Sequence, residues 1–474
     1  MDRQLKRRIL RSALVSFGWL IGTLAVLFGA AAAYYSFDDE LSPDAKALLS
    51  APPKLGEPSD ANGYVAFLGM VAPSGHDQIA WGKKVMAALR AQDADGFKKD
   101  AAWENTVKPQ LGFSKDVSWC APEKQSCLAV AREKGEALAK LLEDNREMLA
   151  RYRAMRVKPV FDEAYVPLRE ESQLPPYLLI GNAQRLALLA VNRKAAAGDL
   201  DGAIGELEQE TAFHGRFAAG TRTLLGKAVA MTLIARDALV LSDLIAANKA
   251  GIASYGARIQ AMSKPLSVDL GLREISLSSE TYAGAKLFVD LRRRMLDGES
   301  PFAGDNALIV MMTGLFYRPN ATVNDLVANH KEQFAILGKG PLDFDQALTK
   351  ADVAARRLES PSWIDVLRNP VGCIYLSLGS PSYAEYFARA YNVTGLVRLV
   401  ALQAAVAGQG IDSPEAIAQF LAGEGAKPYA DPYTGKPMAW DGASRQLYFQ
   451  PRGRGVGWIE ALKTRYNGRI AVTL

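Results

Sequence analysis

The sequence predicts a mainly α-helical protein with one N-terminal transmembrane helix, a large multi-helix body built from helical hairpins, and a small C-terminal β-hairpin. Three observations support this fold class. Residues 12–37 carry no charge, apolar residues recur at three- and four-residue intervals along much of the chain, and turn signals with short apolar runs gather after residue 425. We expect the body to lie outside the cytoplasm, because of the charges on either side of the uncharged run.

The composition is that of a protein that folds as a globule in water. The chain has 474 residues, 49% hydrophobic and 23% charged, which argues against disordered, fibrous and multi-span membrane classes. This length allows two or three domains. The excess of 56 Lys and Arg over 51 Asp and Glu lies almost entirely in residues 1–37. Since the remainder is nearly neutral, it lacks the field that drives binding to a phosphate backbone, and no nucleic acid partner is expected.

The uncharged run at residues 12–37 is long enough to cross a membrane. As a helix, its 26 residues would reach roughly 39 Å, whereas a hydrocarbon core is about 30 Å thick. Basic residues precede the run within residues 1–11, and three acids follow it from Asp38 to Glu40. The positive-inside rule therefore predicts a cytoplasmic basic tail (1–11), a transmembrane anchor (12–37) in a bacterial inner membrane, and a body in the periplasm.

A cleaved signal peptide is the alternative to this anchor. Residues 30–33 are the small residues that a signal peptidase requires, but the apolar stretch of about 20 residues exceeds the usual length of roughly 7–15. Later apolar segments are less suited to spanning: 307–316 is too short, and 228–247 has Arg236 and Asp237 at its centre. We expect one pass through the membrane at most.

Residues 38–60 are a predicted linker, because three prolines fall within 51–60. A short helix is expected to start inside it, at Ser42-Pro43. Residues 61–425 are the predicted helical body. Its segment 123–157 has a long apolar stripe interrupted at Asn145, a side chain that either fixes the packing register or lies at the margin of the stripe. Further helices are expected over 175–248 (three helices), 265–297, 321–337, 344–358 and 382–407.

The first turn within 175–248 has a characteristic sequence. Gly198 suits the left-handed residue that ends one helix, and Asp199 suits the N-cap of the next. The run AAAGDLDGAIGEL resembles the turn inside a tetratricopeptide-type helix pair. No second copy follows at the period of about 34 residues, so the resemblance implies one antiparallel helical hairpin and not a repeat array.

The C-terminal segment 426–474 has a different character. Asp441-Gly442 is a turn signal flanked by the short apolar runs 437–440 and 446–449, which predicts a β-hairpin, and 469–474 is a candidate further strand. Isolated hairpins are marginally stable at best. We therefore expect the apolar side chains of this hairpin to pack on the helical body.

Cys120 and Cys127 are predicted to form a disulfide outside the cytoplasm. On one continuous helix they would lie about 10.5 Å apart, beyond disulfide reach. Pro122 suits the first position of a helix, which would leave Cys120 on a loop that folds back onto Cys127. The alternatives are two unpaired thiols or a zinc site, and zinc would need ligands beyond the three scattered histidines. Cys373 is expected to be a buried apolar thiol.

The sequence contains no motif that identifies a reaction. It lacks the G-x-S-x-G nucleophile elbow and the His-Glu-x-x-His zinc motif. The segment 220–228 departs from a phosphate loop in its glycine spacing and predicts a helix start, and 453–457 is interpreted as a glycine-rich turn. No cofactor or metal site is expected, and the sequence assigns no catalytic residue.

Isolated titratable residues each have an ordinary structural interpretation. His76, in a Pro/Gly loop, is expected to be solvated, with general-base chemistry as the alternative. His214 is expected to be a hydrogen-bonded core histidine. The pair Glu170-Glu171 is interpreted as the solvated end of a segment. Residues 292–294, three arginines, are interpreted as the charged face of an amphipathic helix, with a lipid headgroup or polyanion contact as the alternative.

Together these observations favour a non-catalytic protein of the bacterial envelope. We expect an inner-membrane anchor that holds a helical binding or scaffolding body in the periplasm, with a protein partner there; an assembly factor or an immunity-type protein fits this description. The alternative is a membrane-anchored envelope hydrolase that uses carboxylates in a cleft between helices. A polar cleft with converging carboxylates would favour that alternative.

Overall fold

A computed structural model describes residues 3–93, 99–114, 119–167, 172–263, 270–297, 306–379, 383–455 and 457–474. The protein is mainly helical, with 70% helix and 3% strand, which confirms the predicted secondary-structure class. The chain forms two compact units: unit 1 is Met1–Ala51, Thr281–Lys331 and Val353–Pro381, and unit 2 is Pro52–Glu280, Glu332–Asp352 and Ser382–Leu474. Because each unit joins distant stretches of sequence, the two units cut across the predicted segment 61–425.

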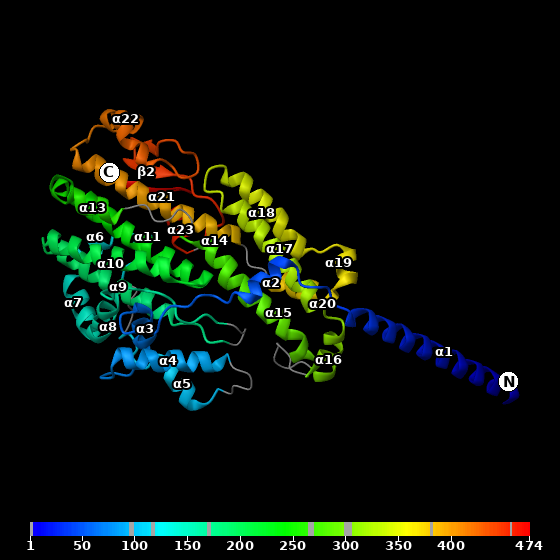
Figure 1. Cartoon of the computed structure of the whole chain (residues 1–474). Helices are drawn as coiled ribbons and strands as arrows, with labels where there is room; N and C mark the ends of the chain where they lie inside the picture. The colour runs from blue at the N-terminus through cyan, green and yellow to red at the C-terminus, as the bar shows by residue number, and fades with distance from the viewer. Residues whose placement is uncertain are drawn as a thin grey trace. The chain divides into compact units, whose positions relative to one another are not determined.

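Unit 1 is built from helices around one small apolar core. Its core side chains include Ala285, Phe288, Leu291, Val323 and Leu326. Figure 1 shows the course of its elements. These are α1 (Arg3–Ser36), α2 (Pro43–Ser50), α15 (Thr281–Leu296), α16 (Ala307–Leu315), the first part of α17 (Pro319–Leu337), the last part of α18 (Phe344–Glu359), α19 (Trp363–Arg368) and α20 (Pro370–Gly379).

Unit 2 holds the larger core and most of the remaining helices. Its helices are α3 (Gly63–Leu68), α4 (Gln78–Gln92), α5 (Ala101–Val107), α6 (Cys127–Glu133), α7 (Gly135–Asp144), α8 (Arg146–Arg156), α9 (Tyr177–Ala196), α10 (Leu200–Gly220), α11 (Leu224–Ala247), α12 (Lys249–Ile252), α13 (Gly256–Met262), α14 (Leu272–Ile275), α21 (Tyr383–Gly408), α22 (Pro414–Ala422) and α23 (Trp458–Arg465). Single-turn 3-10 or π segments occur at Gly69–Val71, Ala253–Tyr255, Ser276–Glu280 and Glu424–Tyr429.

The three helices predicted over 175–248 form the centre of unit 2. α9, α10 and α11 pack on one another, and α21 packs on α11. Gly198 has φ +87°, and the Asp199 carboxylate accepts a hydrogen bond from the Gly202 amide at the start of α10. The expected antiparallel hairpin and both of its turn residues are thereby confirmed.

The stripe over 123–157 is divided among three helices, α6, α7 and α8. Asn145 stands between α7 and α8 and is buried. Its amide nitrogen donates to Leu141 O at 2.8 Å and Ser114 Oγ at 2.9 Å, and its side-chain oxygen accepts from Ser114 N at 2.9 Å. The residue therefore ends one helix and fixes a neighbouring loop, a role that the apolar spacing did not indicate.

The predicted linker 38–60 is bonded to the folded units along much of its length. The Asp38 carboxylate accepts from the amides of Asn320 and Ala321 at the start of α17, and α2 begins at Pro43 after the Ser42 cap, as expected. In unit 2, Gly56 N donates to Glu163 O at 2.8 Å. Buried Asn62 bonds the main chain of Glu57 and Asp162. The proline-rich stretch thus lies along the surface of unit 2.

The C-terminal hairpin is confirmed, and a third strand extends it into a small sheet. β1 (Ala439–Asp441), β2 (Gln446–Phe449) and β3 (Ile470–Thr473) are antiparallel in the order β1-β2-β3. The helix α23 between β2 and β3 was not predicted. As expected, the sheet packs on helices: Leu447 and Phe449 are buried, and a Cβ on Gly395 of α21 would lie 2.6 Å from the Phe449 ring.

Among the described residues, two segments are long and apolar enough to cross a membrane by length and composition. Ser12–Ser36, within α1, has 0% of its most apolar window buried. Pro370–Gly408, which the sequence analysis did not single out and which includes residues outside the described ranges, has 78% of its window buried, as is usual for a core helix of a soluble protein. Of these two segments, α1 is therefore the one whose apolar surface the protein leaves uncovered.

Candidate functional site

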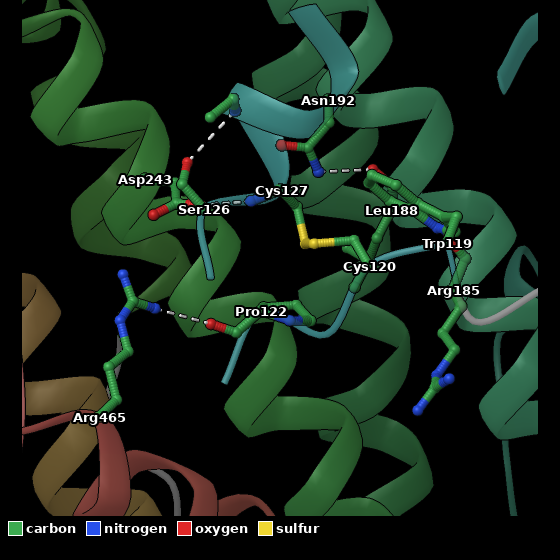
Figure 2. Close-up of a disulfide and its surroundings, with 11 residues drawn as sticks. Trp119, Cys120, Pro122, Ser126, Cys127, Arg185, Leu188, Asn192, Asp243 and Arg465 are labelled. Atoms are coloured by element: carbon green, nitrogen blue, oxygen red, sulfur yellow. Dashed lines mark hydrogen bonds between the residues drawn. A yellow bond between two sulfur atoms is a disulfide. The ribbon is translucent and has the colours of Figure 1, made fainter. Parts of the chain in front are cut away.

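The two cysteines paired by the sequence analysis are joined in the structure (Figure 2), with their Cα atoms 5.7 Å apart. The local geometry differs from the prediction in one respect. The helix begins at Cys127 and not at Pro122, because the Ser126 side chain accepts from Ala129 N and caps α6. Cys120 reaches Cys127 across the turn that precedes the helix. Cys373, on α20, is buried as expected.

The loop that carries the disulfide is bonded to three helices of unit 2. Cys127 N donates to the Asp243 carboxylate of α11 at 3.0 Å, and Trp119 Nε1 donates to Arg185 O of α9 at 2.9 Å. Arg465 of α23 donates to Pro122 O at 3.2 Å (Figure 2). The disulfide therefore lies in a segment whose hydrogen bonds join it to α9, α11 and α23.

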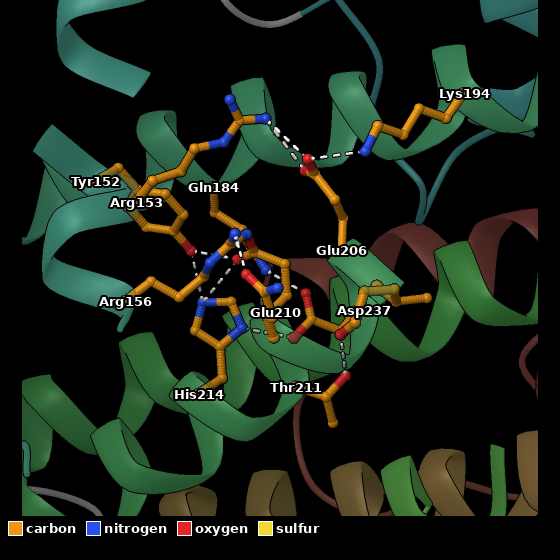
Figure 3. Close-up of polar contacts among 12 residues, drawn as sticks. Tyr152, Arg153, Arg156, Gln184, Lys194, Glu206, Glu210, Thr211, His214 and Asp237 are labelled. Carbon is orange, nitrogen blue, oxygen red and sulfur yellow. Dashed lines mark hydrogen bonds and ion pairs between the residues drawn. The ribbon is translucent and has the colours of Figure 1, made fainter. Parts of the chain in front are cut away.

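A group of buried polar side chains lies among α8, α9, α10 and α11 (Figure 3), and we call it the His214 cluster. Each member exposes 4% of its surface or less. His214 and Glu210 project from one face of α10, one turn apart, because a separation of four residues places side chains on the same side of a helix. The cluster consists of Tyr152, Arg156, Gln184, Glu210, His214 and Asp237.

The cluster forms one continuous chain of hydrogen bonds. His214 Nδ1 lies 2.5 Å from Asp237 Oδ2, and His214 Nε2 lies 3.0 Å from the Tyr152 hydroxyl. Tyr152 donates to Glu210 at 2.5 Å. A donor lies at each end of this series of hydrogen bonds. Arg156 donates to Glu210, and Gln184 donates to Asp237 at 2.9 Å.

These contacts assign the Tyr152 proton. Burial raises the pKa of Tyr152 well above its usual value, so its hydroxyl keeps its proton and donates it to Glu210. The Tyr152 oxygen faces His214 Nε2, and the Asp237 carboxylate faces Nδ1, so each ring nitrogen lies beside an oxygen. The cluster thus sets two carboxyl groups beside the Arg156 guanidinium and the His214 imidazole, and every one of these buried groups has a polar partner.

Opposing effects act on the pKa of Glu210. Burial raises the pKa of its carboxyl, while His214 and Arg156 act in the opposite direction. Next to Asp237 and Thr211 is a cavity of about 40 Å³, which has room for water but not for a sugar or a peptide. The cluster thus has carboxylates that converge without an open cleft, and its geometry joins helices together.

A second buried group surrounds Glu163, which is 0% exposed. Its carboxylate accepts from the Tyr177 hydroxyl at 2.6 Å and from the Arg222 amide. Burial raises its pKa to about 7 against these two hydrogen bonds. Neither the sequence pattern nor any motif pointed to this residue, because its segment has no helical or strand periodicity.

The surface of unit 2 has a groove of about 430 Å³ between α9 and α11. This volume is within the range of roughly 300–1,000 Å³ typical of ligand sites. The floor and walls are partly apolar, with Tyr177, Leu178, Val229 and Leu233, and two cations, Arg185 and Arg236, line it.

Arg236 is the most buried cation of this groove. Burial, and then the neighbouring charge of Arg185, lowers its pKa. The contacts of its guanidinium to Gly181 O and Gln184 Oε1 are long, 3.5 Å each. The carboxylates of Glu123 and Asp237 act on the pKa of Arg236 in the opposite direction, and the groove presents two guanidinium groups to a ligand.

The other predicted residues have structural roles. His76 is exposed, as expected, and His330 is buried beside the Thr281 hydroxyl, with its pKa lowered to about 3 by burial. Leu291 and Met295 are buried on either side of the arginines at 292–294, which agrees with the charged-face interpretation. Glu170 and Glu171 lie outside the described residues.

Within the described ranges, no group of three or more His, Cys, Asp or Glu side chains is placed to hold a metal ion. Comparison of the chain with family models, with curated proteins and with solved structures finds no match. Function is therefore inferred from the chain's own chemistry. Its features are an uncovered apolar helix, a disulfide-bonded helical unit, a buried polar cluster and a groove lined by two arginines.

Proposed function

We propose that this protein is a single-pass inner-membrane protein of a bacterial envelope, with its N-terminus in the cytoplasm and its helical body in the periplasm, where it binds or scaffolds a protein partner. The observation that carries the proposal is the uncovered apolar surface of α1, whose most apolar window has 0% of its residues buried. A contiguous apolar surface of this size requires lipid or a partner to cover it.

Two further features support the compartment. Basic residues precede the apolar run and acids follow it, the arrangement that retains the N-terminus in the cytoplasm. The Cys120–Cys127 disulfide belongs to the part of the chain after α1, and disulfides persist in oxidising compartments such as the periplasm.

The groove between α9 and α11 supports the binding role. Its two arginines and apolar walls suit a segment that presents a carboxylate beside an apolar side chain, because a partly desolvated guanidinium binds carboxylates strongly. We therefore propose that the partner contributes an acidic, partly apolar segment to this groove.

The envelope hydrolase is the second candidate, and the convergence of Glu210 and Asp237 favours it. Both carboxylates, however, are satisfied by Arg156, Tyr152, His214 and Gln184 inside the core. A hydrolase would need them to face a substrate across several ångströms. The binding role is the better supported of the two.

Topology is tested with a reporter that is active only in the periplasm, fused after Leu474, and with the mass of the mature protein. We expect an active reporter and a chain that keeps residues 1–37. A soluble form that starts near Tyr34 would identify a cleaved signal and remove the anchor from the proposal.

The binding role is tested with a photo-crosslinking residue at Leu178, which lines the groove and is 78% exposed. We expect one stoichiometric protein adduct in intact cells that is lost when Arg236→Gln and Arg185→Gln remove the charges. The matched control is the same probe at Val157, which is 67% exposed and outside the groove. Adducts that are equal at the two positions, or insensitive to the arginine variants, would contradict the proposal.

A further inference from the structure

Unit 1 presents a second apolar surface, on α19 and α20, which pack on each other. Five large apolar side chains are more than half exposed there, and we call them the α19–α20 surface: Trp363, Ile364, Leu367, Ile374 and Leu378, with exposures of 72%, 58%, 58%, 58% and 73%. Single exposed apolar residues are ordinary, but a group of this kind on two adjoining helices marks an interaction surface.

The charged residues of α19 are bonded within unit 1. Asp365 accepts from the Ser362 hydroxyl and amide in a capping box, and Arg368 donates to Asp39 at 2.8 Å and lies 3.6 Å from Asp325. The exposed side chains that α19 offers are therefore mostly apolar, and Trp363 is the largest of them.

This surface is joined directly to the last turn of α1. The Tyr35 hydroxyl donates to Leu367 O at 2.6 Å. The Arg318 guanidinium stacks 4.3 Å from the Tyr34 ring and donates to Tyr34 O at 2.8 Å. The main chain of α19 is thus held within one hydrogen bond of the end of the apolar helix.

Hydrogen bonds of Asn369 hold the corner between α19 and α20, so the surface does not need a partner in order to form. Buried Asn369 accepts from the amides of Arg318 and Gly372 and donates to Thr322 Oγ1 at 2.7 Å. A Cβ at Gly372 would lie 2.2 Å from Thr322 Oγ1, which shows how closely α20 approaches α17.

The position of this surface relative to α1 indicates what covers it. Tyr34 and Tyr35 are the aromatic residues that mark the outer membrane–water interface when α1 spans the bilayer. Leu367, bonded to Tyr35, then lies at headgroup depth, and the neighbouring exposed side chains are those that an interface favours: a tryptophan with leucines and isoleucines.

We propose that α19 and α20 lie in the outer leaflet interface of the membrane that α1 crosses, and so form a second membrane contact. This inference rests on the proposed function, because it requires α1 to be in the bilayer. Its consequence is that unit 1 is held against the membrane surface and does not swing freely on α1.

The test uses the full chain in phospholipid nanodiscs, with an environment-sensitive fluorophore on a single introduced cysteine. Leu378→Cys reports on the surface, and Leu178→Cys is the matched control, because both are leucines with similar exposure, 73% and 78%. Val26→Cys, on α1, is the positive control for insertion. Native Cys373 is buried, and burial raises its pKa to about 11, so it should not label; unsubstituted protein checks this.

We expect quenching by lipids with spin-labelled acyl chains, with the spin label near the headgroup for the position at Leu378 and near the chain end for Val26, which lies close to the middle of the uncharged run. The label at Leu378 should be quenched at least half as strongly as the label at Val26, and the label at Leu178 should not respond. Ile374→Cys repeats the measurement at a second exposed position on α20, in case Leu378→Cys lowers the melting temperature.

The failures of the two proposals differ. If Val26 is quenched while Leu378 and Ile374 behave like Leu178, the anchor stands and the second contact is wrong. If Val26 itself is not quenched, the anchor is wrong and the second contact falls with it. A blue shift at Leu378 without lipid quenching would place α20 against protein, such as a second copy, and would also overturn the inference.

Discussion

His214 Nδ1 and the Asp237 carboxylate, 2.5 Å apart in the core of unit 2, join α10 to α11. Neither residue is more than 2% exposed. The other ring nitrogen of His214 contacts the Tyr152 hydroxyl of α8. One imidazole therefore bridges three helices. This pairing makes the stability of unit 2 depend on a few buried polar groups that bond to one another.

Replacing His214 should therefore destabilise the protein strongly. His214→Ala leaves the buried Asp237 carboxyl without the imidazole that lies 2.5 Å from it, and breaking a buried pair of this kind costs about 3–5 kcal/mol. Chemical denaturation of the full chain in detergent measures it. The control is Arg258→Ala, which removes more exposed ion pairs with Asp201 and Glu208 and should cost at most about 1 kcal/mol. Equal losses would contradict the role of the cluster.

Glu163 should make stability depend on pH. Burial raises its pKa from 4.5 to about 7, so the folded state holds this proton more tightly than the unfolded chain does. Its contribution to stability is present below about pH 4.5 and is lost as the pH rises through 7, on the order of 3 kcal/mol in total. Glu163→Gln, which resembles the protonated acid, should flatten the decline in melting temperature from about pH 5 to 8.

The control for this pH effect is Glu147→Gln. The Ser74 hydroxyl holds the pKa of Glu147 below its usual value, so that group titrates at lower pH and its replacement should not alter the slope in this range. The other buried carboxyls with raised pKa, among them Glu280 and Asp243, leave some slope in the variant. An unchanged slope in Glu163→Gln would show that Glu163 is ionised throughout.

Thiol counting should separate the three cysteines. In denatured but unreduced protein isolated from cells we expect one reactive thiol, Cys373, and three after reduction, because Cys120 and Cys127 are paired. Reduction should lower stability by about 2–3 kcal/mol, the loop-closure contribution of so short a loop. Three thiols before reduction would rule out both the disulfide and the support it gives to an oxidising compartment.

Gly395→Ala should weaken the packing of the C-terminal sheet on α21. The new Cβ would lie 2.6 Å from the Phe449 ring, so we expect a loss of about 1–3 kcal/mol from overpacking. Gly215→Ala, in α10, is the matched control, since nothing lies within 4 Å of its Cβ position; it should stabilise by about 0.5–1 kcal/mol. A neutral Gly395→Ala would mean that Phe449 moves freely.

Much of the local structure could be predicted because it depends on residues near one another in sequence. Gly198 and Asp199 end and start helices through their own backbone and side chain, and the hairpin turn follows from Asp441-Gly442. The Cys120–Cys127 pair could be proposed because seven residues limit its geometry. The start of α6 was misplaced because both Pro122 and Ser126 suit a helix start, and only the hydrogen bond from Ala129 N shows which residue caps it.

The functional candidates could not be predicted in the same way. Glu210 and Asp237 are 27 positions apart, and nothing local to either indicates that His214 and Arg156 lie beside them. The groove exists only because α9 and α11 are neighbours, which brings Arg185 to Arg236. Spacing along a chain reports which face of a helix is apolar, but not which helix covers it.

The sequence by itself determined the class of structure: the uncharged run of residues 12–37, the asymmetry of charge around it, the helical hairpins and the C-terminal hairpin are all local patterns. Only the tertiary structure decided which apolar faces stay uncovered and which charges meet. Leu367 comes to Tyr35 across 332 positions, and no pattern in either segment encodes that contact, because it depends on how α17 and Asn369 fold the chain back to the end of α1.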